Sequence, residues 1–554
     1  MRQNRMLAIL LGVLSTLVLI VGGLSASLLL TGKGGTSGTN SSRSDTGSGA
    51  TAASGRIRIP GTDPSTMDPH LASDSTSAEY IVEIFSGLVT IGPPPKLDLQ
   101  LDLAKSVEIS PDGKTYTFVL RDNATFHDGR KVTADDVKWS IERAASKQLA
   151  SPTAMSYLSD IVGMPEYFQG KAQNIAGIEV VDPSTIRFKI DSPKPYFLAK
   201  LSYPTSFVVD RKQVEANPRN WTRKPNGTGP YMLTEWRLGE RIALTAYDKF
   251  YLGTPKLKEA VYLISGGSAL TRFENNELDI APLSINDIDR ARDPGQALSK
   301  LYSSSPQFSI SYIAFNSKLP PFDDPAVRRA MGMAIDRKKI SDVTFKGMLA
   351  PASGIMMPGL PGYTPEVKTL QFDPNAAKAE LAKSKYGTGP GKIPFPTITM
   401  TEAGGGASAG IDTQAYIEQW KTVLGLNIEI KQLDFATFIA DQQSKKLQMF
   451  SAGWVMDYPD PEDVMDLKFY STSSLNEQSY SNPAVDKLLD AARSEKDTNQ
   501  RLDLYRQAEK LIIADAPWLP LYYSLAHQVV SPSVKGWFEP PMVLPRLRFV
   551  EVTR

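Results

Sequence analysis

The chain of 554 residues contains no cysteine and only three histidines. Without cysteine it can form no disulfide, offers no thiol nucleophile and can carry no lipid on an N-terminal cysteine. The histidines, His70, His127 and His527, lie far apart, and no His-x-x-x-His pair occurs. A zinc site therefore has little support, and we expect neither a metal nor a cofactor.

The chain also lacks an excess of positive or negative charge. Lysine and arginine number 61 against 60 aspartates and glutamates, for a net charge of +1, and no basic block follows the N-terminus. The electrostatic footprint of a nucleic-acid-binding protein is therefore missing. Hydrophobic residues make up 41% and charged residues 22% of the chain, as in ordinary globular proteins. The length predicts roughly three to four structural units.

A long uncharged run stands at the N-terminus, where Arg2 and Arg5 precede the apolar residues 6–30. A helix of this length spans ~37 Å, enough to cross a ~30 Å hydrocarbon core. The preceding arginines favour a cytoplasmic N-terminus with the rest of the chain exported. Residues 1–31 are thus predicted to be a transmembrane anchor or a signal segment. The run's length favours an uncleaved anchor, with cleavage near Ala26 the alternative. The Gly/Ser/Thr-rich residues 32–55 are predicted to be a flexible linker.

Strand and helix signals alternate through the remaining chain. Thr133, with Asp136 three residues later, is typical of a helix start, and Asp324-Pro325 opens another helix. A glycine-rich loop at 402–410 joins a predicted strand to a predicted helix, the kind of junction where open α/β sheets bind ligands. This alternation predicts an α/β fold.

The most distinctive stretch covers residues 450–463. An apolar run ends in Gly453-Trp454, and then an acid, Asp457, and an aromatic, Tyr458, precede two prolines that stop regular structure. We predict a strand that ends in a rigid loop presenting Trp454, Asp457 and Tyr458. Large aromatic rings beside one acid suit an organic ligand with a cationic group. The alternative is a surface turn with Trp454 in the core.

Several separate segments, all in one order, carry a family resemblance. They are residues 116–122, 126–129, 133–137, 227–231, 315–316, 324–330, 453–461 and 517–521. With these segments the body from residue 56 onward resembles the extracellular solute-binding proteins of ABC transporters, in the oligopeptide-, dipeptide- and nickel-binding family (family 5). The few, scattered histidines make nickel the less favoured ligand.

The resemblance implies a two-lobe fold of the type II periplasmic-binding-protein class that closes around its ligand by a hinge motion. Residues 56–310 would form lobe I, with an inserted subdomain at roughly 95–215. Residues 311–520 would form lobe II, and residues 521–554 would return to lobe I.

The resemblance also implies site residues. Asp457 matches the acid that pairs with the amino terminus of a bound peptide, and Trp454 would line the pocket wall. The full predicted ligand-binding set is Gly453, Trp454, Met456, Asp457 and Tyr458 from one stretch and Asp74, Ser75 and Thr76 from another. Dipeptide binders hold the ligand carboxylate with an arginine in the loop that corresponds to 402–410, and here that loop has no basic residue. A longer peptide or another cationic organic solute therefore stays open.

The predicted function is a non-catalytic receptor, most simply a monomer, that captures a peptide-like or other cationic organic solute outside the cytoplasmic membrane and delivers it to an ABC permease. It would be held at the membrane by its N-terminal helix, or be periplasmic if that helix is cleaved. The alternatives are an extracytoplasmic hydrolase, for which no Gly-x-Ser-x-Gly or His-Glu-x-x-His pattern is present, and a sensor or chaperone on the same fold.

Overall fold

The computed structural model describes residues 55–404, 409–473 and 475–554. The predicted anchor and most of the predicted linker, residues 1–54, lie outside these ranges. Within the described residues no helix combines the length and the apolar character needed to cross a membrane.

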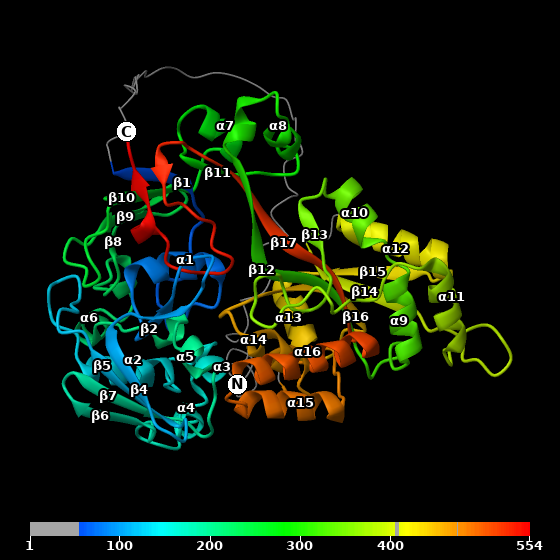
Figure 1. Cartoon of the computed structure of the whole chain (residues 1–554), viewed down its shortest axis with the longest axis horizontal. Helices are drawn as coiled ribbons and strands as arrows, with labels where there is room; N and C mark the ends of the chain where they lie inside the picture. Colours follow the sequence, from blue (N-terminus) through cyan, green and yellow to red (C-terminus); the bar gives the residue numbers. More distant parts are fainter. Residues whose placement is uncertain (1–54, 405–408, 474) are drawn as a thin grey trace, which may run out of the picture.

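The described chain folds into two α/β bodies that lie side by side and are joined by long strands (Figure 1). The first body, lobe I, contains a four-stranded sheet in the order β1 (Arg56–Pro60), β10 (Glu259–Leu263), β9 (Arg241–Ala246), β8 (Tyr231–Arg237). Strand β1 alternates, with Ile57 and Ile59 buried, and helix α1 (Ser75–Ile84) contributes buried side chains to the same core. Because one strand face is apolar, the register that buries it is favoured over a slip by one residue.

Lobe I also holds a separate antiparallel sheet in the order β4 (Ala104–Ile109), β5 (Thr115–Leu120), β7 (Thr185–Lys189), β6 (Ile178–Asp182). Every second residue of β5 is buried, so this strand turns one face to the core. Helix α2 (Ala134–Ala144) begins at Thr133 with the predicted capping box, in which Thr133 and Asp136 satisfy each other's backbone amides.

The second body, lobe II, is organised on a seven-stranded mixed sheet. Its order is β11 (Ile280–Pro282), β17 (Trp518–Val530), β12 (Tyr302–Phe315), β16 (Met449–Val455), β14 (Ile398–Ala403) and β15 (Ile428–Leu433), with β13 (Leu349–Pro351) paired to β17. The larger helices around it are α9 (Pro325–Met333), α11 (Pro374–Lys383), α12 (Ile411–Leu424), α14 (Glu462–Phe469), α15 (Pro483–Ser494) and α16 (Thr498–Asp515). Helix α9 starts as predicted, because the Asp324 side chain accepts a hydrogen bond from the Ala326 amide and Pro325 takes the first turn.

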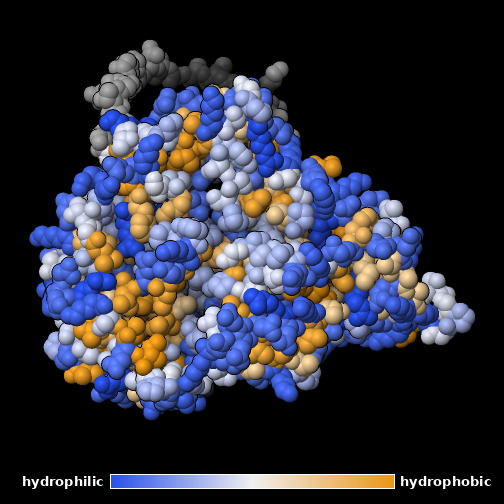
Figure 2. Space-filling model, viewed as in Figure 1, coloured by the Kyte–Doolittle hydropathy of each residue, from blue (hydrophilic) through white to orange (hydrophobic). Residues whose placement is uncertain are grey.

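The remaining elements are short and connect or cover these sheets. They are β2 (Val89–Ile91), β3 (Leu99–Leu101), α3 (Ala154–Leu158), α4 (Met164–Phe168), α5 (Phe197–Lys200), α6 (Arg211–Ala216), α7 (Ala269–Glu274), α8 (Ile288–Arg292), α10 (Arg337–Thr344), α13 (Phe435–Gln443), β18 (Val534–Lys535) and β19 (Glu551–Val552). On the face shown in Figure 2 hydrophilic residues predominate, and hydrophobic residues gather at the lower left, over lobe I.

The two lobes are connected through β12 and β17, which run antiparallel to each other across the molecule (Figure 1). Residues 302–306 of β12 pair with 525–529 of β17, and residues 310–314 pair with 518–523. The ladder shifts register between Pro306 and Ile310. A second shift follows between Ser311 and Tyr312. A paired strand crossing with two irregular points gives a stiff connection in which the irregular points are the places to bend.

Candidate functional site

A cavity of about 700 Å³ lies between the lobes. Lobe I contributes the N-terminal end of α1, the Tyr203–Pro204 turn and the C-terminal segment 542–545 to its wall. Lobe II contributes the ends of β14 and β16, and the two connecting strands contribute residues 309–311 of β12 and Ser524 of β17. A pocket of this size between lobes, built from strand ends and a helix start, is where a small organic ligand would be enclosed.

Strand β16 carries the predicted stretch into this cavity. Gly453 and Val455 are partly exposed while Trp454 between them is buried, which is the alternation of a strand with one open face. The ladder sets Gly453 opposite Ser311 and Val455 opposite Ser309, and the Met456 amide donates to the Phe308 carbonyl at 2.8 Å. The strand therefore ends where the lobes meet.

Asp457 is the first residue beyond these pairs, and its half-buried carboxyl group lines the cavity. Burial raises its pKa from 3.8 to about 6, and a hydrogen bond from the Tyr157 hydroxyl partly opposes this rise. Tyr157 belongs to α3 of lobe I and stacks on Tyr203 with ring centroids 3.9 Å apart. The acid of one lobe thus meets a tyrosine pair of the other.

A second acid, Asp463 at the start of α14, lies directly behind Asp457. One of its oxygens, Oδ2, accepts hydrogen bonds from the Asp457 amide and from Trp454 Nε1, both at 3.1 Å. Complete burial, followed by the charge of Asp457, raises the pKa of Asp463 well above its ordinary value. Burial therefore favours the neutral form of Asp463, which lies behind Asp457, the member of the pair that faces the cavity.

Trp454 and Tyr458 are placed differently from the expectation that they would line the pocket. Trp454 is 4% exposed and packs in the core of lobe II, where the Lys468 ammonium lies 4.6 Å from the centroid of its ring. Tyr458 is 1% exposed, packs edge-on against Tyr157, and donates its hydroxyl hydrogen to Glu462. Strand alternation turns Trp454 away from Gly453, and both aromatic side chains pack behind the loop that carries Asp457.

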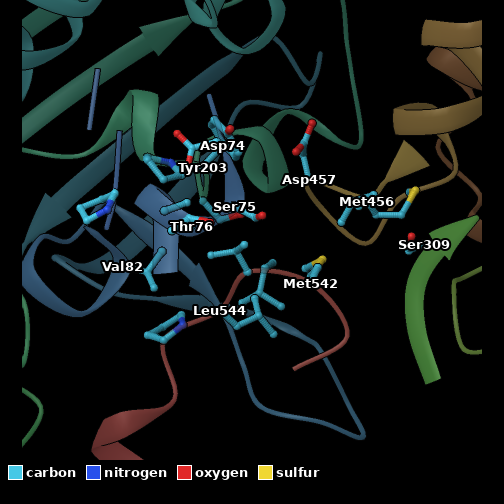
Figure 3. A pocket seen from close by; sticks show the side chains of 18 of the residues that line it. Asp74, Ser75, Thr76, Val82, Tyr203, Ser309, Met456, Asp457, Met542 and Leu544 are labelled. Atoms are coloured by element: carbon cyan, nitrogen blue, oxygen red, sulfur yellow. The ribbon is translucent and has the colours of Figure 1, made fainter. Parts of the chain in front are cut away.

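The predicted lobe I residues Asp74, Ser75 and Thr76 also line the cavity, opposite β16 (Figure 3). Asp74 is the N-cap of α1, and its Oδ1 accepts from the Ser77 amide at 2.8 Å. Its other oxygen, Oδ2, accepts from the Ser65 hydroxyl at 2.5 Å. The carboxylate of Asp74 is therefore occupied in fixing the helix start, whereas the neighbouring hydroxyls of Ser75 and Thr76 are at the wall.

An apolar section of the wall was not foreseen from the sequence. It is formed by Val82 and Phe85 of the α1 region, Ile91 of β2, and Met542 and Leu544 of the C-terminal segment. Val82, Met542 and Leu544 lie together on one side of the cavity in Figure 3. The sequence signal was weak, since Met542-Val543-Leu544 is a short apolar run between prolines without strand or helix periodicity.

The glycine-rich loop after β14 borders the same cavity through Ala403 and Gly404, and its residues 405–408 lie outside the described ranges. Glu402, at the loop's start, accepts hydrogen bonds from the Gly410 amide, the Thr413 hydroxyl and the Gln432 amide nitrogen. This acid ties the two ends of the loop together and is not part of the cavity wall.

The three histidines all have structural partners. The ring of His70 contacts the Phe207 carbonyl and Arg143, and that of His127 contacts the Gly229 carbonyl and the Gly227 amide. His527 contacts the Tyr302 hydroxyl and the Met348 carbonyl. Burial lowers the pKa of both His70 and His127 to about 4. Since every ring nitrogen is engaged and none of the three lines the cavity, no histidine is placed to act there as a general base.

Comparison with known proteins identifies the family. The model of the bacterial extracellular solute-binding proteins, family 5, matches residues 98–476. The dipeptide-binding protein DppE of Bacillus subtilis is 27% identical over 498 residues, covering 87% of this chain and 88% of the relative. The periplasmic murein peptide-binding protein MppA of Escherichia coli is 28% identical over 488 residues, covering 86% and 88%.

Solved structures of peptide-binding proteins are similar to this chain over most of its length. The Escherichia coli murein tripeptide binding protein MppA superposes with a TM-score of 0.74 at 27% identity, covering 90% of this chain and 98% of that one. An oligopeptide-binding protein of Borrelia burgdorferi also gives a TM-score of 0.74 at 27% identity, covering 90% and 100%. Both are two-lobe binding proteins, which confirms the predicted two-lobe α/β fold. The chain belongs to the bacterial extracellular solute-binding proteins of family 5 and serves ABC transport as a solute receptor.

Proposed function

We propose that this receptor binds a peptide-like or other cationic organic solute in the cavity between its lobes, with the ligand's ammonium group on Asp457, and delivers it to an ABC permease. The observation that carries the proposal is the half-buried Asp457 carboxyl, which lines the cavity with a tyrosine hydroxyl as its side-chain partner and no cation beside it in the described lining. An ammonium–carboxylate contact in a desolvated site is a strong charge-assisted hydrogen bond.

Relatives support a peptide-like ligand. The names of DppE and MppA specify dipeptides and murein peptides, and solved family members include complexes with peptides. In this proposal the amino terminus lies at Asp457, the hydroxyls of Ser75 and Thr76 contact the ligand's backbone, and Gly453 and Met456 border its first residue. Trp454 and Tyr458 would act from behind by fixing the loop.

The division into lobes is proposed on the same basis. We place lobe I at 56–310, with its inserted subdomain at roughly 95–215, lobe II at 311–520, and the return to lobe I at 521–554. The register shift of β12 before Ile310 and the separate sheet β4–β7 support these bounds. Residues 1–31 would anchor the receptor at the outer face of the membrane or be removed as a signal segment, which the mass of the mature protein would distinguish.

A non-catalytic, monomeric receptor is proposed over the hydrolase. The engaged histidines support this choice, and a receptor returns its ligand unchanged. A sensor on the same fold would bind equally well, so the permease assignment is tested by solute uptake in cells that lack the protein.

The test of ligand class starts with native mass spectrometry of protein purified without denaturation. A retained series of peptide masses supports the proposal, and a single non-peptide mass would redirect it. Calorimetry then compares one peptide with its N-acetylated form. We expect the acetylated peptide to bind at least 30-fold more weakly, as for loss of a desolvated ion pair worth about 2 kcal/mol or more. Equal affinities would remove Asp457 from the proposed role.

A further inference from the structure

The cavity between the lobes has a wall whose described residues carry no positive charge. Its described lining contains no lysine, arginine or histidine, and it includes four aspartates, Asp63, Asp74, Asp102 and Asp457. The other polar side chains of the described lining carry hydroxyl groups, among them Thr90, Ser309 and Ser311. A ligand carboxylate placed here would face like charge and have no counterion, which is unfavourable in a site of reduced dielectric.

Three of the four aspartates accept hydrogen bonds from other groups of the protein. Asp63 accepts from Trp236 Nε1 at 3.1 Å and from the Gly239 amide at 2.7 Å, and Asp74 caps α1. Asp102 accepts the hydroxyl hydrogen of Tyr251. Their lone pairs are directed to these donors, so Asp457 is the lining acid best placed to accept a donor from a ligand.

The apolar wall of the same cavity has the chemistry to bind hydrocarbon. Val82 and Leu544 are 6% exposed, Met542 4% and Phe85 1%, so the surface they present is the cavity surface itself. In Figure 3, Val82, Leu544 and Met542 lie in the lower part of the view, below Ser75 and Thr76. A ligand that fills the cavity therefore has one acid for a cation and an apolar wall for the rest of its body.

We propose that this site selects ligands with a single cationic head and an apolar body, and that it binds no carboxylate: a peptide's carboxyl end must be blocked or must extend out of the cavity. The inference rests on the proposed function and narrows its ligand class. It excludes free dipeptides, in which both charged ends would be enclosed together. It also predicts that apolar side chains behind the amino terminus are favoured over acidic ones.

The test uses the full chain and one pentapeptide, Ala-Leu-Ala-Leu-Ala, in three forms: free at both ends, amidated at the carboxyl end, and both acetylated and amidated. Calorimetry should show that the amide binds at least as tightly as the free acid, and that acetylation weakens binding at least 30-fold. A free acid that binds tenfold or more tighter than the amide would overturn the proposal, because it would require a cation at the wall.

A second series separates this inference from the peptide assignment. It compares n-butylamine to n-octylamine with the carboxylates of the same chain lengths in a thermal-shift assay. We expect stabilisation by the amines only, with affinity rising roughly threefold to fourfold per methylene until the apolar wall is covered. Amine binding without peptide binding would refute the peptide assignment and leave this inference standing. Carboxylates that match the amines, or a complete lack of binding in both series, would overturn it.

Discussion

Replacing Asp457 by asparagine should weaken ligand binding and strengthen the ligand-free fold. The substitution keeps the shape of the side chain and a carbonyl oxygen for the Tyr157 hydroxyl, and it removes the charge. Affinity for a ligand with an ammonium group should fall by about 2–4 kcal/mol, or 30-fold to about 1000-fold, because the ammonium loses its desolvated partner.

The gain in stability follows from the pKa of the same group. In the fold the pKa of Asp457 is about 6 instead of 3.8, so its ionised form is disfavoured by burial. Each pKa unit corresponds to 1.36 kcal/mol, so the ionised carboxylate costs the ligand-free fold up to about 3 kcal/mol at pH 8. Asparagine removes this cost, and the free energy of unfolding should rise by as much as that amount.

The assay is chemical denaturation of the ligand-free protein at pH 8, together with calorimetry of the ligand found by mass spectrometry. Asp63→Asn is the matched control, since Asp63 also lines the cavity but has its own donors, Trp236 and Gly239. We expect it to lose less than tenfold in affinity and to gain no stability. A destabilised Asp457→Asn protein that binds with unchanged affinity would show that Asp457 is a structural acid and would refute the reasoning.

Three further predictions follow from neighbouring groups. Ligand affinity should fall roughly tenfold per pH unit below about pH 6, where Asp457 takes up a proton. The free energy of unfolding of the ligand-free protein should rise over the same range, from about pH 6 to pH 4, because the folded state binds this proton more tightly than the unfolded state does. Calorimetry and thermal melting at several pH values measure the two effects, and an affinity that stays constant from about pH 7 to 5 would contradict the prediction. Asp74→Ala should lower the free energy of unfolding by about 1 kcal/mol through loss of the α1 N-cap, and denaturation should show this loss while Asp74→Asn retains most of the stability. Lys200→Met should leave Glu462 of the other lobe without its cation, at 3.6 Å in the native protein, and so favour separated lobes. Small-angle scattering should then show a larger radius of gyration without ligand, whereas Lys194→Met, whose ion pairs stay within lobe I, should not change it.

Much of the fold could be predicted because its signals are local. The capping box at Thr133 and the Asp324-Pro325 helix start each depend on a few consecutive residues and are confirmed. The glycine at position 227, in one of the segments that carry the family resemblance, has a physical reason in the structure. A Cβ atom on Gly227 would lie 2.0 Å from the Ile84 carbonyl oxygen, so only glycine permits this approach to the end of α1.

The site was predictable only in part, because its walls come from distant segments. The sequence indicated Asp457 and the start of α1, and the structure brings both to one cavity. It could not indicate that Tyr157 would face Asp457, since these residues are three hundred positions apart and no pattern links them. Aromatic character suggested that Trp454 lines the pocket, but the alternation of β16 turns Trp454 into the core, while its neighbours Gly453 and Val455 line the cavity.

The position of Asp457 connects ligand charge to lobe closure. Its carboxyl group lies on lobe II, and its hydrogen-bond donor, Tyr157, lies on lobe I. When the lobes meet, the acid loses water before any protein cation reaches it, which penalises closure around an empty cavity. A ligand ammonium removes that penalty and therefore binds the closed arrangement better than the open one, which is the condition for a ligand to shift a two-state equilibrium. A neutral or anionic solute of the same shape would leave the penalty in place. The receptor would thus close on solutes that bring a cation, and a partner permease that recognises the closed form would receive only those.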